Sequence, residues 1–223
     1  MLDPELIDAC IVSDRHEIMP RTPGISSWVA FLDAASGAGK DSMCLAVAGQ
    51  EIMSDRPVLA CLREWAPPFS PEAVCAECST IMKSYGLRRV ISDRYALNWV
   101  SERLRSHGVT LEYSTRPKSD LYRELIPLVT SKSVDLLNNK KLRNQLMSLE
   151  RRLSRAGVET IDAAGHEDLA NAAAGALVLA NEGGGGPLVG AIGLSNSRSS
   201  YVNDDLRQRQ WAAYVTHSEI PTR

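Results

Sequence analysis

The sequence predicts an α/β fold in which a mixed central sheet carries helices on both faces. Three observations predict it. Compact apolar runs typical of strands fill the first third of the chain, amphipathic helical segments dominate later, and strands and helices alternate between residues 88 and 113. At 223 residues with 44% apolar composition, the chain is long enough to bury one large core without disulfides or zinc.

Three strands are expected first. The apolar run Trp28–Leu32 ends in Asp33 and predicts a buried strand. The small, Gly-rich stretch 34–40 predicts a turn, and residues 42–48 return as the second strand of a hairpin. Residues 57–65 predict a third strand, which two prolines end shortly afterwards.

Helices and strands then alternate. Ser70-Pro71-Glu72 is a strong helix start, and the expected helix over 70–85 ends at a glycine. Residues 88–92 form a fourth strand, 96–107 a helix and 109–113 a fifth strand. The fourth strand leads directly into Asp93.

Helices dominate the remainder. The expected helices cover 119–129, 139–154, where leucines recur every three or four residues, and 167–181, which is rich in alanine. A short edge strand is expected over 158–161. We therefore divide the chain into a lead-in segment (1–27) with room for one short helix, a folded domain (28–182) and a tail of uncertain order (183–223).

Composition and charge exclude several classes of protein. A net charge of −2 excludes a uniformly basic nucleic-acid coat, although a local basic face remains open. The longest apolar run, 172–180, is far shorter than the roughly 20 residues of a membrane span. The acidic start is not a secretory signal, so we expect a cytoplasmic, non-secreted protein. Cys75 and Cys78 lack a second ligand pair for zinc, and we interpret them as ordinary small apolar residues.

The Gly39-Lys40 pair invites comparison with a phosphate-binding loop. That motif would need glycine at position 34 and Ser or Thr at position 41, where the chain has Ala34 and Asp41. The missing hydroxyl is the one that would hold Mg²⁺. We therefore interpret the stretch as a hairpin turn.

Carboxylates are the most informative set. Asp33 and Asp93 each follow a predicted strand, and strand ends are where α/β sheets bind ligands. Asp168 lies in the first turn of the alanine-rich helix. If the two strands are neighbours and the helix crosses their ends, the three acids converge and require a hard divalent cation such as Mg²⁺ or Mn²⁺. Taken singly, each acid could equally be a helix cap or a turn residue.

Five stretches together resemble one known family, the nuclease domain of phage terminase large subunits. The resemblance runs in order through residues 28–182. The stretches are Phe31–Ser42, Ala66–Pro71, Val90–Ala96, Leu142–Arg152 and Gly165–Ala172.

The resemblance implies an RNase H-like fold and a two-metal DNA endonuclease that cleaves double-stranded concatemeric viral DNA during genome packaging. It places the catalytic, metal-binding roles on Asp33, Asp93 and Asp168, with two Mg²⁺ or Mn²⁺ ions. Glu167, where the family often has a second Asp, and Asp41 are weaker metal candidates. Implied partners are double-stranded DNA, a portal protein, a small terminase subunit and a packaging ATPase domain, in the cytoplasm of the infected bacterial host. The Walker motifs of that ATPase are absent from this sequence, which suggests an isolated nuclease domain or a stand-alone relative.

Basic residues concentrate in residues 83–123 and 140–155. Such clusters supply phosphate-backbone contacts, although charged helices are often only solvated faces. The candidate DNA contacts are Arg94, Lys118, Lys140, Lys141 and Arg143. Two alternatives stay open: a non-catalytic module that docks DNA or the portal, and another RNase H-like nuclease such as a junction resolvase.

Overall fold

The computed structural model describes residues 2–37, 39–93, 98–153, 159–163 and 165–183. The candidate Arg94 and the predicted tail from residue 184 onward lie outside the described residues. The elements that position the candidate site all lie within the compact unit formed by the first 189 residues.

The central sheet has five strands in the order β3-β2-β1-β4-β5. Strands β1 (Ile25–Asp33), β2 (Met43–Glu51) and β3 (Pro57–Trp65) form an antiparallel meander. Strands β4 (Arg89–Ser92) and β5 (Thr110–Tyr113) extend it in parallel, with β4 beside β1. The predicted mixed sheet and its hairpin are confirmed, and β1, β4 and β5 form its parallel part.

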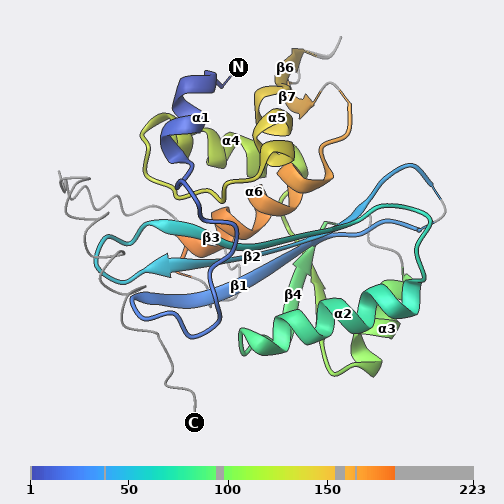
Figure 1. Cartoon of the computed structure of the whole chain (residues 1–223). Helices are drawn as coiled ribbons and strands as arrows, with labels where there is room; N and C mark the ends of the chain where they lie inside the picture. Colours follow the sequence, from blue (N-terminus) through green and yellow to red (C-terminus); the bar gives the residue numbers. More distant parts are fainter. Residues whose placement is uncertain (1, 38, 94–97, 154–158, 164, 184–223) are drawn as a thin grey trace. The chain divides into compact units, whose positions relative to one another are not determined.

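Helices cover both faces of the sheet, as predicted (Figure 1). On one face α6 (Asp168–Asn181) crosses β1, β2 and β3, and the other helices of this layer surround it. These are α1 (Pro4–Cys10), α4 (Lys118–Thr130) and α5 (Lys140–Met147). On the opposite side, α2 (Pro71–Ser84) and α3 (Asn98–Ser106) pack together beside β4 and β5.

Helix α6 is the centre of the core. Eleven of its fourteen residues are buried, and most of them are alanine. A Cβ added at Gly175 would lie 2.3 Å from the ring of Phe31 on β1, well inside the 3.0 Å that non-bonded Cβ contacts essentially never cross. The small side chains therefore let α6 lie directly against the sheet, and this sets the spacing between the two elements that frame the site.

The predicted helix over 139–154 is wrong in its second half. Helix α5 ends at Met147, and β6 (Leu149–Leu153) pairs with β7 (Glu159–Ala163) in a separate two-stranded sheet. The leucine spacing misled because it continues to Leu153, which is 75% exposed and belongs to no buried face. Consequently β7 is not at the edge of the central sheet.

The lead-in segment contributes to the core. Leu2, Ile7 and Cys10 join the main hydrophobic cluster, with α1 packed against α4 and α5. All five cysteines are buried free thiols, including Cys75 and Cys78. Among the described residues, no helix has both the length and the apolar character needed to cross a lipid bilayer.

Candidate metal centre

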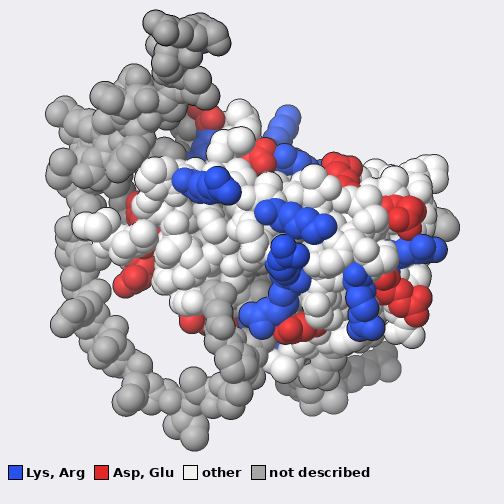
Figure 2. Space-filling view, turned by 90° about the horizontal axis from the view of Figure 1, so that it is seen from below, with Lys and Arg blue, Asp and Glu red and all other residues white. Residues whose placement is uncertain are grey.

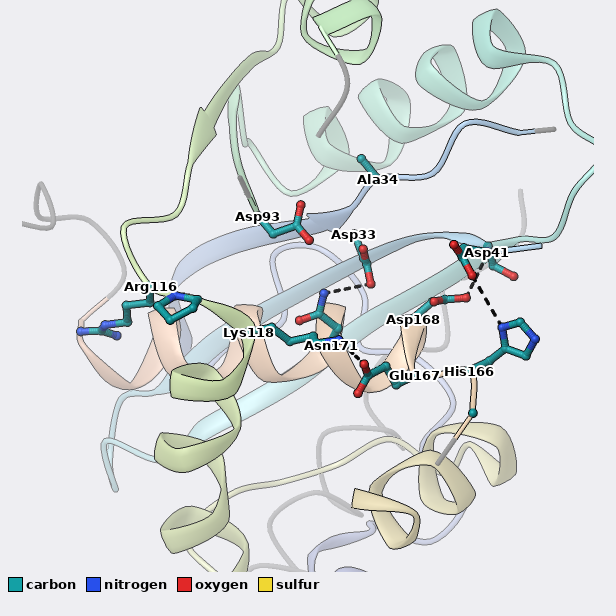
Figure 3. A pocket seen from close by; sticks show the side chains of 13 residues that line it. Asp33, Ala34, Asp41, Asp93, Arg116, Lys118, His166, Glu167, Asp168 and Asn171 are labelled. Atoms are coloured by element: carbon teal, nitrogen blue, oxygen red, sulfur yellow. Dashed lines mark hydrogen bonds and ion pairs between the residues drawn. The ribbon is translucent and has the colours of Figure 1, made fainter. Parts of the chain in front are cut away.

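An open pocket lies where β1 and β4 end and α6 begins (Figure 3). It gathers side chains from segments that are far apart in the sequence. The lining residues are Asp33, Ala34, Asp41, Ser42, Asp93, Arg116, Pro117, Lys118, Gly165, His166, Glu167, Asp168 and Asn171.

The three predicted acids all line this pocket. Asp33 is the last residue of β1, and Asp93 follows β4; because Leu32 pairs with Ser92 in parallel, the two acids leave neighbouring strands at the same edge. Asp168 begins α6, and its Oδ2 accepts a hydrogen bond from the Ser42 backbone N–H at 2.9 Å. In Figure 3 the carboxyl group of Asp33 lies between those of Asp93 and Asp168.

The pocket opposes ionisation of its central acid. The pKa of Asp33 is raised to about 7, mainly because the carboxyl group is buried. The hydrogen bond from Asn171 lowers this pKa, whereas the negative charges of Asp93 and Asp168 raise it. Burial also raises the pKa of Asp168, although the Ser42 hydrogen bond opposes this rise. An added cation would relieve both effects, because it favours the charged form of each carboxylate.

Asn171 was not anticipated from the sequence. Its Nδ2 donates to Asp33 Oδ2 at 2.9 Å, and this fixes the orientation of the acid. The side chain is 1% exposed, yet its Oδ1 has no hydrogen-bond partner among the described residues. A buried polar oxygen without a partner is costly and calls for a ligand. The signal in the sequence was only its position, one helical turn after Asp168.

The donor set fits a hard divalent cation. Asp33, Asp93, Asp168 and the Oδ1 of Asn171 offer only oxygen atoms, which Mg²⁺ and Mn²⁺ prefer. Within the described ranges, no three His, Cys, Asp or Glu side chains are already close enough to form a metal-binding group. The acids thus surround the pocket as separate groups.

Glu167 and Lys118 belong to an ion-pair network beside the pocket. Lys118 Nζ donates to Glu167 and, at 3.2 Å, to Asp162. The other Glu167 oxygen accepts from the Tyr122 hydroxyl at 3.0 Å and from the Ala163 N–H at 3.1 Å. Glu167 is 8% exposed, and burial raises its pKa. Both side chains are therefore engaged with protein groups, which favours a role in holding the start of α6 over direct contact with DNA or metal.

The remaining candidates lie at the rim or elsewhere. Asp41 and His166 are both exposed at the pocket mouth, 3.8 Å apart from Oδ1 to Nδ1. On α5, Lys141 is paired with Glu64, and Arg143 Nη2 lies 2.7 Å from Asp8 Oδ2. Lys140 is exposed. None of the three α5 cations lines the pocket.

Solved structures with a similar fold include viral terminase nucleases. The large terminase nuclease from thermophilic phage G20c, with bound magnesium, matches at 18% identity and a TM-score of 0.56, over 79% of this chain and 94% of that one. The HK97 bacteriophage large terminase matches at 16% identity and a TM-score of 0.61, over 78% of this chain. The chain has the terminase nuclease fold. A manganese-soaked human cytomegalovirus terminase nuclease domain also shares it, at 13% identity and a TM-score of 0.52, over 79% of this chain and 92% of that one.

This terminase nuclease fold is the RNase H-like α/β fold expected from the sequence. No family model and no curated protein sequence matches the chain. The aligned part spans 43% of the HK97 protein, against 94% of the G20c nuclease. The similarity therefore concerns the nuclease part of a large terminase.

Proposed function

We propose that this chain is a divalent-metal-dependent endonuclease that cleaves double-stranded concatemeric viral DNA during genome packaging. The observation that carries the proposal is the convergence of Asp33, Asp93 and Asp168 around one open pocket of the terminase nuclease fold. The unpartnered Oδ1 of Asn171 in the same pocket supports it.

Asp33, Asp93 and Asp168 would hold the metal, as two Mg²⁺ or Mn²⁺ ions. Bound there, the metal would supply a water of lowered pKa and stabilise the leaving 3′ oxygen of the phosphodiester. Asn171 holds the Asp33 carboxylate in place from α6, and the Ser42 N–H holds Asp168. Asp33 and Asp168 are thus oriented before substrate arrives, which is what a preorganised site requires.

The start of α6 is held from a second direction. Gln145 on α5 is buried, and its Oε1 accepts the Ala170 N–H of the first turn of α6 at 2.9 Å. Lys118 pairs with both Glu167 and Asp162 close to the pocket. Part of their negative charge is therefore compensated within the protein.

In this proposal the domain works with a portal protein, a small terminase subunit and a packaging ATPase domain in the cytoplasm of the infected bacterial host. The support is its likeness to the nuclease part of the HK97 large terminase.

Plasmid cleavage with Mn²⁺ or Mg²⁺ tests the activity. We expect Asp33→Asn and Asp168→Asn each to reduce the rate at least about a thousandfold, roughly 4 kcal/mol of transition-state stabilisation. Asp14→Asn is the matched control, since Asp14 is exposed and its φ of 61° suits asparagine. Undiminished cutting by Asp33→Asn would refute the metal centre. Preference for a four-way junction over linear duplex would instead support a junction resolvase.

A further inference from the structure

Three cations gather at the end of the sheet opposite the pocket. Arg88 precedes β4, and its carbonyl oxygen accepts the Thr110 N–H at 2.9 Å where β5 begins. Lys83 lies in the last turn of α2, with its Nζ 3.9 Å from the place of a Cβ on Gly108. Arg105, near the end of α3, accepts the Gly108 N–H at 2.9 Å through its carbonyl. We call Lys83, Arg88 and Arg105 the α2–α3 patch.

The side chains of the α2–α3 patch are exposed and uncompensated. None of the three makes a side-chain hydrogen bond or ion pair with any part of the chain that the structure describes, whereas nearby Arg89 pairs with Glu112 and Arg103 with Glu72. Interaction with helix dipoles accounts for cations in the last turns of α2 and α3. It does not account for Arg88, which lies outside both helices.

Figure 2 shows the face on which α2 and α3 lie, and several Lys and Arg side chains lie close together there. The basic run on α5 and β6 differs, although it looks stronger in the sequence. Lys141 pairs with Glu64, Arg143 with Asp8 and Arg151 with Glu159. Free positive charge is therefore concentrated on the α2–α3 side.

The patch fits a phosphate backbone better than a protein surface. Protein interfaces centre on aromatic or apolar anchors, whereas phosphate contacts require only cations on a rigid support. The large exposed apolar side chains among the described residues lie elsewhere; Tyr113, for instance, is at the far end of β5. They are Met19, Ile52, Met53, Tyr113 and Leu153.

We propose that the α2–α3 patch binds the phosphate backbone of duplex DNA at a surface separate from the metal pocket. The choice of DNA as the ligand rests on the proposed function. Arg88 directly precedes β4 and Asp93 directly follows it. The two residues are five positions apart, which is about 16 Å at 3.3 Å per residue. About five base pairs cover that length, so one duplex can reach both ends. An acidic pocket repels DNA, and a remote cationic surface supplies the affinity that the pocket lacks.

The test measures binding of a fluorescent 30-base-pair duplex by anisotropy in EDTA, over a series of salt concentrations. The variant Lys83→Gln/Arg88→Gln/Arg105→Gln should bind at least about tenfold more weakly at low salt. Its plot of log affinity against log salt should lose about 2.7 units of slope, or about 0.9 per phosphate contact. The matched control removes two other exposed cations, Arg21 and Lys132, which are not among the candidate DNA contacts, and should keep most of the slope. Thermal melts establish that each variant folds.

Unchanged affinity in the patch variant, or an equal loss in the control, would overturn the proposal. So would displacement of the duplex by polyglutamate as effectively as by unlabelled duplex, since that assigns the patch to an acidic protein partner. Failure of the proposed function can be distinguished from failure of this proposal. If the parent protein cuts no DNA but the patch variant binds DNA more weakly, the patch is supported and the nuclease assignment is wrong. If the parent protein cuts DNA with Mn²⁺ and the patch variant binds DNA normally, the nuclease assignment is supported and the patch proposal is wrong.

Discussion

Strand β1 and helix α6 meet at two places that differ in every physical respect. At Phe31 and Gly175 the contact is apolar, fully buried and so close that no side chain fits between the elements. Two residues further along β1, Asp33 contacts Asn171 at the wall of an open pocket. There the pKa of Asp33 is raised, and the Oδ1 of Asn171 has no hydrogen-bond partner among the described residues.

The difference separates what holds the domain together from what it does. The Phe31–Gly175 contact is closely packed and leaves no cavity in the core, so it contributes stability. The Asp33–Asn171 contact concentrates like charge and an unpaired polar atom, which cost stability in the absence of a ligand. A site that must bind a cation has to leave such groups uncompensated, and the adjacent core has to offset their cost.

The largest stability effect should come from adding a side chain at the apolar contact between α6 and β1. Gly175→Ala places a methyl group against Phe31, and we expect about 3 kcal/mol of destabilisation in urea unfolding. Gly39→Ala is the control, because its new Cβ would have its nearest heavy atom at 3.5 Å. Adding Phe31→Leu to Gly175→Ala should recover part of the loss. A cost below about 0.5 kcal/mol for Gly175→Ala would show that α6 and the sheet separate easily.

A bound cation should stabilise the polar contact by a somewhat smaller amount. At a hundredfold excess over its dissociation constant, Mn²⁺ should add about 2.7 kcal/mol to the free energy of unfolding. That corresponds to a rise of roughly 5–10 °C in the melting temperature for a domain of this size. The Asp33→Asn/Asp168→Asn double variant should show no rise. An equal rise in both proteins would place the cation elsewhere.

Removing the central charge should stabilise the metal-free protein. Because the pKa of Asp33 is raised to about 7, the folded state keeps a proton that the unfolded state releases, and stability falls as pH rises from about 4 to about 7. In EDTA, Asp33→Asn should therefore be more stable than the parent at pH 8 and match it near pH 4. Urea unfolding across this range measures the difference. Parallel pH profiles for the two proteins would mean that Asp33 carries no such penalty.

Much of the fold followed from local pattern. Apolar runs, turn glycines and the Ser70-Pro71 start signal act within a few residues, so most strands and helices lie where they were predicted. The failure at 139–154 arose because leucine spacing alone does not show that residues 149–153 leave the helix and pair with β7. Of the predicted DNA contacts, Lys141 and Arg143 are neutralised by acids 77 and 135 residues away, which no local pattern reveals.

By itself, the sequence determined the five strands of the central sheet and that Asp33 and Asp93 lie at the ends of two of them, because strand propensity and chain order are local properties. Only the tertiary structure decided that β1 and β4 are neighbours and that α6 brings Asp168 to the same pocket. It also decided that Asn171 supports Asp33 across 138 positions of sequence, and that Glu167 is engaged by Lys118 and Tyr122. The physical reason is that packing brings distant groups together, and burial then sets the charge and hydrogen bonding of each one.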